Sequence, residues 1–440
     1  MIRQTLVLSG VILTVAIAAL AQTAAQSAAP RLDDAVKRQV IRELGTMLRD
    51  RYVFPDVGGK AARHIESRLA AGEYKSAAVA STFADTLTRD LQEITKDKHL
   101  NVSLQPPAIQ ATRDDAEKRR LQFERQVRRD NCGFKKVELL PGNVGYLHLN
   151  VFGSPELCGE TAVSAMGFLA NADAIIIDLR QNGGGEPSMV QLLSTYFFDQ
   201  PTHLNSLYWR EGDRTEQYWT LPHVSGRRMP KTPLWVLTSE RTFSGAEEFS
   251  YNVRMLGRAR LVGEASGGGA NPGDFMDLPG GLGVFMPTGR AINPISRTNW
   301  EGTGVEPHVK VAAAEALGVA HLEALRALQA NAGGSERAEL EWEIAGIEFK
   351  PGNVRLDDAA RSRYVGAYGE RRVSLRDGEL YYQREGRPVL RLVPMTETLF
   401  AVEGLDYFRV RFERGSDGAT TKLVGIYADG TSDESPRDAK

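Results

Sequence analysis

The run from Ala174 to Leu179 constrains the fold more than any other stretch of this 440-residue chain. It reads Ala-Ile-Ile-Ile-Asp-Leu, so it is apolar on both faces of an extended strand. Strands of this kind form the buried centre of an α/β sheet, whereas strands with one solvent-exposed face alternate apolar and polar residues. The sequence therefore predicts an α/β core with this strand inside it.

The strand runs into a triple-glycine turn, Gly183 to Gly185, which precedes a predicted helix from Ser188 to about Phe198. Glycines at such a turn let backbone N–H groups point at an anion, as in phosphate loops and oxyanion holes. A phosphate loop needs a lysine after the last glycine, and a dinucleotide site needs spaced glycines; neither pattern is present. An oxyanion hole and a plain tight turn remain as the two interpretations.

A second strand-to-helix junction carries Ser244, between the apolar run Leu234 to Leu237 and a helical pattern that ends near Leu256. Such a junction presents a serine hydroxyl beside the N–H groups of the helix start, where a nucleophile is useful. Ser244 is also a sound N-cap, and Glu247 completes a Ser-x-x-Glu capping box. Taken alone, this stretch favours the cap, so the rest of the chain must decide.

His99 lies where predicted helices end and an alternating strand, Asn101 to Leu104, begins. Functional side chains tend to sit at junctions of this kind. An isolated histidine is nonetheless more often a surface or satisfied residue than a base, and six other histidines compete with it. The nearest rival is His148, on another predicted strand.

Hydrophobic periodicity divides the chain into four parts after its first residues. Residues 31–104 predict a helical bundle, and residues 105–330 predict the α/β core. Residues 331–348 read as a linker. Residues 349–440 alternate in short runs separated by turns, which predicts a small antiparallel β domain.

The first 21 residues resemble a secretory signal, with Arg3, an apolar run from Leu6 to Leu20 and a small-residue site at Ala21. The alternative is a membrane anchor, but the run is short for a span and no later segment qualifies. We therefore expect an exported protein, periplasmic or extracellular, without a membrane span in the mature chain. A formal net charge of −2 argues against a nucleic-acid partner.

The chain has two cysteines, Cys132 and Cys158. Export would permit a disulfide between them, and two buried free thiols are the equally weighted alternative. Two cysteines alone are a poor metal site, so no metal is predicted.

Several ordered motifs resemble the tail-specific (C-terminal processing) serine protease superfamily, in its branch with tricorn cores and interphotoreceptor retinoid-binding protein repeats and without a PDZ domain. The resemblance covers residues 33–312 and rests on six motifs. They are Tyr52-Val53-Phe54-Pro55, Asp97-Lys98-His99-Leu100, Gly145-Tyr146-Leu147, the run from Asp178 to Gly185, the run from Thr242 to Glu247, and the run from Glu301 to Pro307.

The resemblance implies a ClpP/crotonase-like ββα core and assigns three catalytic roles. Ser244 matches the nucleophile, His99 the base and Glu301 the acidic member of a tricorn-like network. The N–H groups of Gly245 and Gly184 would form the oxyanion hole. No cofactor is implied.

The sequence departs from the family pattern at three places. Where Ser/Lys members carry a lysine after the serine, this chain has Ser266 to Ala270, so the lysine mechanism is not expected. The span from Gln105 to Leu140 is too short for a PDZ module. Lys98 stands where the tricorn network has a serine, which leaves open how Glu301 reaches His99.

The leading hypothesis is an exported serine peptidase that acts on peptides or unfolded protein tails through an acyl-enzyme on Ser244. The alternative is a non-catalytic binding protein of the same fold, for an apolar ligand or a peptide.

Overall fold

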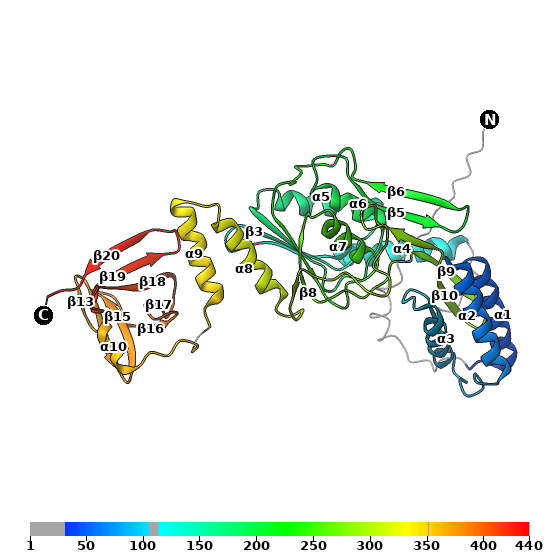
Figure 1. Cartoon of the computed structure of the whole chain (residues 1–440), viewed down its shortest axis with the longest axis horizontal. Coiled ribbons are helices and arrows are strands. Elements are labelled where there is room, and N and C mark those ends of the chain that lie inside the picture. Colours follow the sequence, from blue (N-terminus) through cyan, green and yellow to red (C-terminus); the bar gives the residue numbers. More distant parts are fainter. Residues whose placement is uncertain (1–30, 105–112, 351, 440) are drawn as a thin grey trace. The chain divides into compact units, whose positions relative to one another are not determined.

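The computed structural model describes residues 31–104, 113–350 and 352–439. It divides into two compact units (Figure 1). The first holds the chain up to Leu140 together with Gly145–Ala320, and the second holds Pro141–Val144 and His321–Lys440. The predicted signal, residues 1–21, lies outside the described residues. No described helix is long and apolar enough to cross a membrane.

The first unit begins with three helices, α1 (Asp34–Asp50), α2 (Pro55–Ala70) and α3 (Ala80–Thr95). Their apolar faces pack on a three-stranded antiparallel sheet (Figure 1). Its order is β1-β10-β9, made of Asn101–Leu104, Leu282–Pro287 and Gly273–Leu278. Because β1 begins two residues after His99 and pairs with β10, it holds the His99 segment against a distant part of the chain.

The central sheet has six strands in the order β12-β8-β7-β4-β3-β2. Their bounds are Val309–Lys310, Arg260–Gly263, Leu234–Thr238, Ala174–Asp178, Val144–Leu149 and Phe134–Leu140. The first four are mutually parallel. Every residue of β4 is buried, as its apolar sequence predicts.

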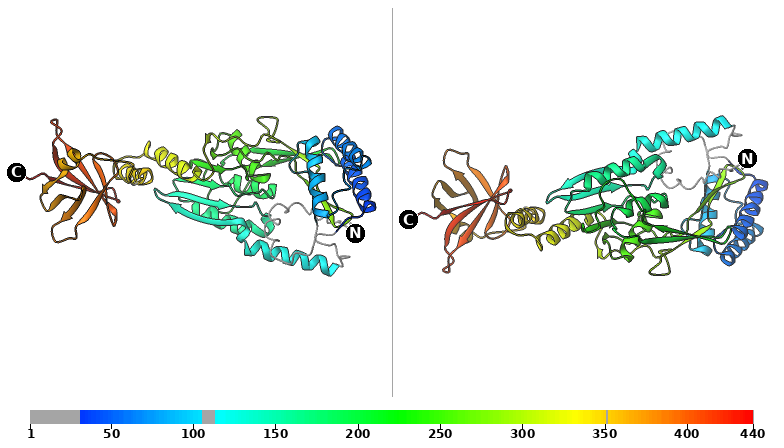
Figure 2. Two further views of the ribbon diagram at one scale, coloured as in Figure 1. Left: turned by 90° about the horizontal axis from the view of Figure 1, so that it is seen from below. Right: turned by 90° about the horizontal axis from the view of Figure 1, so that it is seen from above.

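Helices α5 (Pro155–Leu169), α6 (Pro187–Thr195) and α7 (Gly245–Met255) pack with this sheet in one hydrophobic core. Figure 2 shows them gathered beside the strands. Helix α4 (Arg113–Arg129) and the short η2 (Asn131–Gly133) precede β2. A small antiparallel sheet, β11-β5-β6, completes the unit with Gly289–Ile292, His203–Trp209 and Arg214–Trp219.

The second unit contains an eight-stranded antiparallel sheet, β13 to β20 in chain order. The strands are Gly366–Tyr368, Arg371–Arg376, Glu379–Arg384, Leu390–Pro394, Leu399–Val402, Leu405–Arg414, Thr420–Tyr427 and Ser432–Pro436. Asp438 N–H donates to Ala367 O at 3.0 Å, so the last segment also bonds to the first strand. Buried aromatic side chains, including Tyr364, Tyr368 and Phe412, fill the interior.

Helices α8 (Ala316–Gln329), α9 (Gly334–Glu348) and α10 (Asp358–Tyr364) precede these strands. The segment 331–348, predicted as a linker, therefore contains a helix, and α9 buries Leu340 and Trp342. The predicted α/β class, the helical N-terminal part and the antiparallel C-terminal sheet are confirmed.

Candidate active site

Ser244 occupies a strained turn between β7 and α7. Its backbone has φ 53° and ψ −121°, a conformation that residues with a side chain rarely adopt. Strain of this kind persists only where surrounding contacts enforce it, and it concentrates at functional sites. One such contact is the N–H of Ser244, which donates to the Glu247 carboxylate at 2.8 Å. The predicted cap and the predicted nucleophile therefore occupy the same turn.

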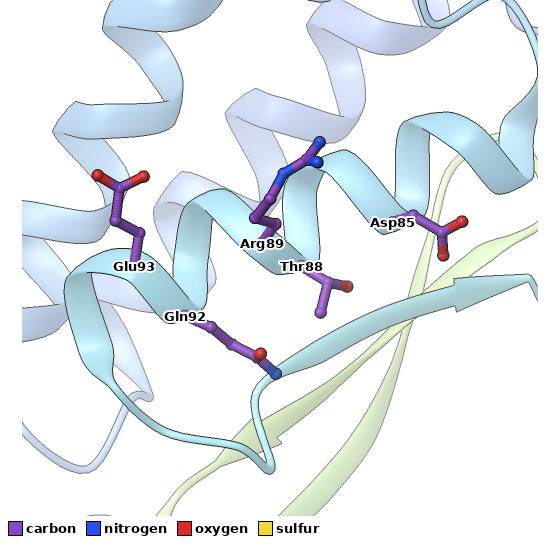
Figure 3. A pocket seen from close by; sticks show the side chains of 5 residues that line it. All are labelled: Asp85, Thr88, Arg89, Gln92 and Glu93. Carbon is purple, nitrogen blue, oxygen red and sulfur yellow. The ribbon is translucent and has the colours of Figure 1, made fainter.

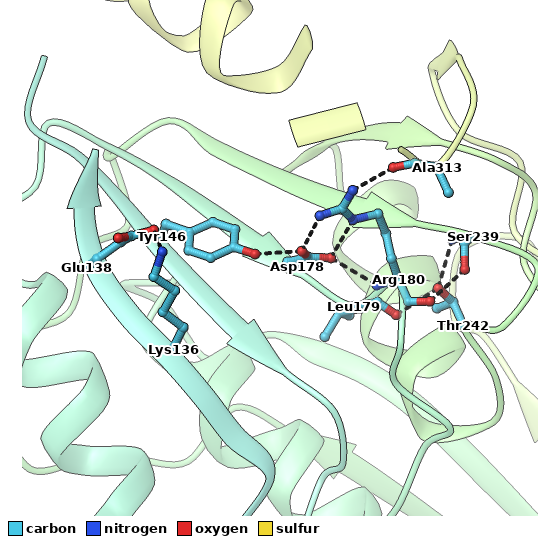
Figure 4. Close-up of polar contacts among 9 residues, drawn as sticks. All are labelled: Lys136, Glu138, Tyr146, Asp178, Leu179, Arg180, Ser239, Thr242 and Ala313. Carbon is cyan, nitrogen blue, oxygen red and sulfur yellow. Dashed lines mark hydrogen bonds and ion pairs between the residues drawn. The ribbon is translucent and has the colours of Figure 1, made fainter. Parts of the chain in front are cut away.

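The ends of β4 and β7 are tied together just before their two turns (Figure 4). The hydroxyl of Thr242 donates to Leu179 O at 2.8 Å, and that of Ser239 donates to Arg180 O at 2.6 Å. Arg180 in turn pairs with the buried Asp178 at 2.6 Å. These contacts hold the triple-glycine turn beside the Ser244 turn.

The triple-glycine turn has no room for side chains next to Ser244. A Cβ on Gly184, where φ is +109°, would lie 2.7 Å from Ser244 Cβ and 2.8 Å from Gly245 N. The N–H of Gly184, the predicted oxyanion donor, donates to Asn182 Oδ1 at 2.8 Å. Among the described residues, no hydrogen bond uses the N–H of Gly185, which lies beside Gly245.

His99 is buried between two aromatic rings. The Phe243 centroid lies 4.6 Å away and the Phe285 centroid 5.6 Å away. Burial lowers the pKa of the imidazole to about 4, so the ring is neutral at physiological pH. Its Nδ1 atom is buried without a hydrogen-bond partner among the described residues. A neutral imidazole with a free nitrogen can accept a proton from a hydroxyl.

Glu301 lies in the same cluster as His99. One carboxylate oxygen each of Asp97 and Glu301 and one ring nitrogen of His99 lie within 4.8 Å of one another. One Glu301 oxygen accepts the Ala270 N–H at 2.6 Å, while Oε1 is buried without a partner among the described residues. Burial, and then the charge of Asp97, raise the pKa of Glu301 to about 8. The structure thus brings Glu301 to His99 without the serine of the tricorn pattern.

Asp97 is a member of this cluster that sequence reasoning did not assign. It accepts the His99 backbone N–H at 3.0 Å, the Tyr52 hydroxyl at 3.1 Å and the Asn271 amide at 2.9 Å. Burial raises the pKa of its carboxyl. Both Asp97 and Tyr52 belong to motifs that carry the family resemblance, which was the available signal.

Glu247 is the second functional residue that sequence reasoning missed, because its place in a capping box explained it fully. Its side chain is completely buried. Burial raises its pKa to about 7, although four donors surround it. These are the N–H groups of Ser244, Gly268 and Gly269 and the Ser266 hydroxyl.

The predicted nucleophile and base are close neighbours that share no hydrogen bond. Ser244 follows Phe243 directly, and the Phe243 ring packs against His99. No hydrogen bond joins Ser244 and His99 among the described residues. Catalytic hydrogen bonds are often long before substrate binds, so this arrangement is compatible with a Ser/His pair.

Within the part of the chain that the structure describes, two groups of side chains come close enough to share one cation: the Asp97 cluster, and His64 with Asp90 and Glu93. In the first, both Asp97 oxygens already accept hydrogen bonds. In the second, Arg68 pairs with Asp90 at 2.9 Å and supplies the positive charge. We interpret the first group as an acid–base cluster and the second as packing between helices.

A solvent-open hollow of about 490 Å³ lies on α3 (Figure 3). Polar side chains from a single helix line it: Asp85, Thr88, Arg89, Gln92 and Glu93. Gln92 donates to Leu100 O at 3.1 Å, so the hollow lies near the His99 segment. None of its lining residues belongs to the cluster around His99, and we assign it no role.

The structure joins Cys132 and Cys158 in a disulfide. The bond links η2 to α5. Gly133, the residue after Cys132, is connected to the triple-glycine turn through the segment 150–152. The Asn150 N–H donates to Gly133 O at 2.9 Å, and Phe152 N–H donates to Gly184 O at 2.8 Å. The disulfide therefore supports the backbone that flanks the triple-glycine turn.

Comparison with known proteins identifies two sequence profiles that match this chain. The sequence profile of peptidase family S41 matches residues 143–311. The profile described as the N-terminal domain of Peptidase_S41 in eukaryotic IRBP matches residues 26–131. Together the two matches span more than half of the chain.

Individual relatives are more distant. The carboxy-terminal processing protease CtpB of Bacillus subtilis (strain 168) is 21% identical over 213 residues, 48% of this chain and 42% of that protein. A carboxyl-terminal-processing protease of Picosynechococcus sp. is 28% identical over 154 residues, 34% and 35% of the two chains. The match thus spans less than half the length of either relative. Among solved structures, a photosystem II D1 C-terminal processing protease is 25% identical over 38% of this chain and 42% of that chain, with a TM-score of 0.32.

Proposed function

Because this chain belongs to peptidase family S41, we propose that it is a serine peptidase that hydrolyses peptides or unfolded protein tails. The curated relatives are named for processing carboxyl-terminal segments, which supports this substrate class. Export, from the signal-like first 21 residues, is part of the same proposal.

The single observation that carries the proposal is the cluster of His99 and Glu301 beside the Ser244 turn. A ring nitrogen of His99 and a carboxylate oxygen of Glu301 lie within 4.8 Å of each other, and the Phe243 ring packs against the imidazole next to the nucleophile turn. A serine hydroxyl is a weak nucleophile until a neighbouring base takes its proton. The arrangement supplies that base and a carboxylate to stabilise the imidazolium that forms.

In the proposed reaction, His99 removes the proton as Ser244 Oγ attacks the scissile carbonyl. Glu301, when ionised, holds the protonated ring. The developing oxyanion is bound by backbone N–H groups, for which we propose Gly245 and Gly185, because the Gly184 N–H is already engaged by Asn182. His99 then protonates the leaving amine, and water releases the acyl group by the reverse sequence.

The decisive experiment replaces Ser244 by alanine and by glycine. Both changes should abolish cleavage of a peptide library and labelling by a fluorophosphonate. Glycine adopts the observed φ of 53° without steric cost, whereas alanine keeps the strain, so the glycine variant should be at least as stable as the alanine variant. Wild-type protein that cleaves nothing and resists labelling, yet binds an apolar ligand tightly, would instead support the binding protein.

A further inference from the structure

The loop Ser266–Asn271, which we call the strap, connects β8 to β9 and binds all three buried carboxylates of the site. It occupies the place where lysine-dependent relatives would carry their lysine. Three consecutive strap residues and Asn271 each donate to a carboxylate. Gly268 and Gly269 donate to Glu247, Ala270 donates to Glu301 and the Asn271 amide donates to Asp97.

The strap is also anchored on its other side. Lys98 Nζ donates to Gly267 O at 2.5 Å, and the Trp300 indole donates to Gly269 O at 2.7 Å. These two donors are the immediate neighbours of His99 and Glu301. The lysine that replaces the tricorn serine therefore fastens the base segment to the strap.

Gly269 fixes the distance between the strap and the catalytic side chains. A Cβ there would lie 2.3 Å from Phe243 Cζ and 2.7 Å from His99 Cε1. The strap backbone thus presses against the base and against the residue before the nucleophile. A small displacement of the strap would move His99 relative to Ser244.

Glu247 accepts hydrogen bonds from both the strap and the nucleophile turn. Its Oε2 accepts the N–H groups of Ser244 and Gly269, each at 2.8 Å. Its Oε1 accepts the Gly268 N–H at 2.6 Å and the Ser266 hydroxyl at 2.5 Å. Only a carboxylate offers acceptors at both oxygen positions.

We propose that Glu247 is a positioning residue for the peptidase reaction: it holds the Ser244 turn in a fixed position relative to the strap, and the strap contacts His99 and Glu301. The proposal rests on the proposed function and deepens it. Glu247 touches neither substrate nor reacting atoms and acts through the strap. In Glu247→Gln, the side-chain NH₂ group replaces one of the two oxygens and so faces two of the four hydrogen-bond donors. We expect the loss of these hydrogen bonds to weaken the connection between the Ser244 turn and the strap.

The test compares Glu247→Gln with Glu248→Gln. The two glutamates are adjacent in α7 and both are buried, but no strap hydrogen bond involves Glu248. Displacing catalytic groups by about 1 Å costs on the order of 100-fold in rate, so E247Q should lose about 100-fold in kcat with little change in KM. E248Q should retain wild-type kcat and KM. Equal kcat for the two variants would overturn the proposal.

A readout without catalysis separates this proposal from the proposed function. In protein with ¹³C-labelled histidine, the His99 Cε1–H resonance is identified by its loss in His99→Gln. It should shift in E247Q and stay unchanged in E248Q, because the strap and Phe243 pack on that atom. If the resonance shifts in E247Q but the wild-type protein cleaves nothing, the peptidase proposal is wrong and the positioning role of Glu247 stands. If the wild-type protein is an active peptidase and the resonance does not shift in E247Q, the positioning role is wrong and the peptidase proposal stands.

Gly269→Ala provides the test if E247Q does not fold. This change keeps the N–H groups that donate to Glu247, but its methyl group would lie 2.3 Å from Phe243 Cζ and 2.7 Å from His99 Cε1, so the strap or the two rings must shift. It should lower kcat and shift the same resonance. Wild-type kcat together with an unmoved resonance would overturn the proposal.

Discussion

The imidazole of His99 and the ring of Phe243 lie with their centroids 4.6 Å apart and their planes inclined by 40°. Phe243 precedes Ser244, so the residue that shapes one side of the nucleophile turn also forms a wall of the histidine site. Aromatic contacts at this separation contribute about 0.5–1.5 kcal/mol beyond area burial. The contact is thus strong enough to hold a neutral imidazole in place.

Replacing Phe243 by alanine should therefore damage catalysis as well as stability. The ring of His99 would lose one wall, and we expect kcat to fall about 10-fold or more, because misplaced catalytic groups react slowly. Phe243→Leu keeps most of the volume and should retain most of the activity. The measurement is kcat with the rate of fluorophosphonate labelling. Unaltered labelling in the alanine variant would show that the ring does not position His99.

The pH dependence should report the carboxylates rather than the imidazole. The low pKa of His99, about 4, keeps the ring neutral, while the pKa of Glu301 is raised to about 8. If the reaction needs ionised Glu301, kcat/KM rises with pH through about 8 and then levels off. A histidine base with an ordinary pKa would instead make kcat/KM rise with pH through about 6.5.

Asp97→Asn should move the rise of kcat/KM, which we assign to Glu301, to lower pH. Burial is the main cause of the raised pKa of Glu301, but the Asp97 charge adds to it, and asparagine removes that charge. Glu301→Gln should abolish the rise and leave kcat/KM low at every pH. The measurement is kcat/KM as a function of pH for the wild type and both variants. If the rise stays at the same pH in both variants, it reports a group other than Glu301.

The parts of the site that depend on short stretches were predictable from sequence. The buried strand β4, the glycine turn and the Ser244 junction each follow from local composition, and all three form as expected. The reason is that strand burial and helix starts are determined within a few residues. Residues 331–348 show the limit of local signals: the glycines at the start of α9 are typical of a linker, yet Gly334–Glu348 is helical.

The contacts between the strap and Asp97 could not be predicted from sequence, for a physical reason. The hydrogen bond between Asn271 and Asp97 joins residues 174 positions apart. Contacts at that separation impose no periodicity on either segment. The strap's glycines are also indistinguishable from those of any flexible loop until His99 and Phe243 are seen to fill the space beside them.

Removing the disulfide should lower stability substantially. Cys132 and Cys158 are 26 positions apart, and both are buried. In the chain-entropy account, a loop of this size contributes about 3.5 kcal/mol. That is equivalent to roughly 10 °C in the midpoint of a large unit. Calorimetry of Cys132→Ser/Cys158→Ser should show this loss, and wild type with reductant should match it. A midpoint that reductant does not change would mean that the sulfurs are not bonded in solution.

Glu248 should make the protein less stable as the pH rises. Burial raises the pKa of its carboxyl from 4.5 to about 7, an effect that Asn205 offsets in part. Between these values the folded state binds more protons than the unfolded state, so the free energy of unfolding falls with increasing pH. The stabilising proton is fully bound below the unfolded pKa and is lost as the pH rises through the folded pKa.

Glu248→Gln replaces the carboxyl by a neutral group of the same shape, so it should abolish this one contribution. Near pH 5 the variant and the wild type should be similarly stable, and near pH 8 the variant should be more stable by up to about 3 kcal/mol. Other buried acids, such as Glu247, keep their own pH dependence in both proteins, so the difference between the two urea-unfolding curves isolates Glu248. If that difference is the same at both pH values, the Glu248 carboxyl is ionised in the folded protein at the lower pH as well, and solvent or a cation must reach it inside α7.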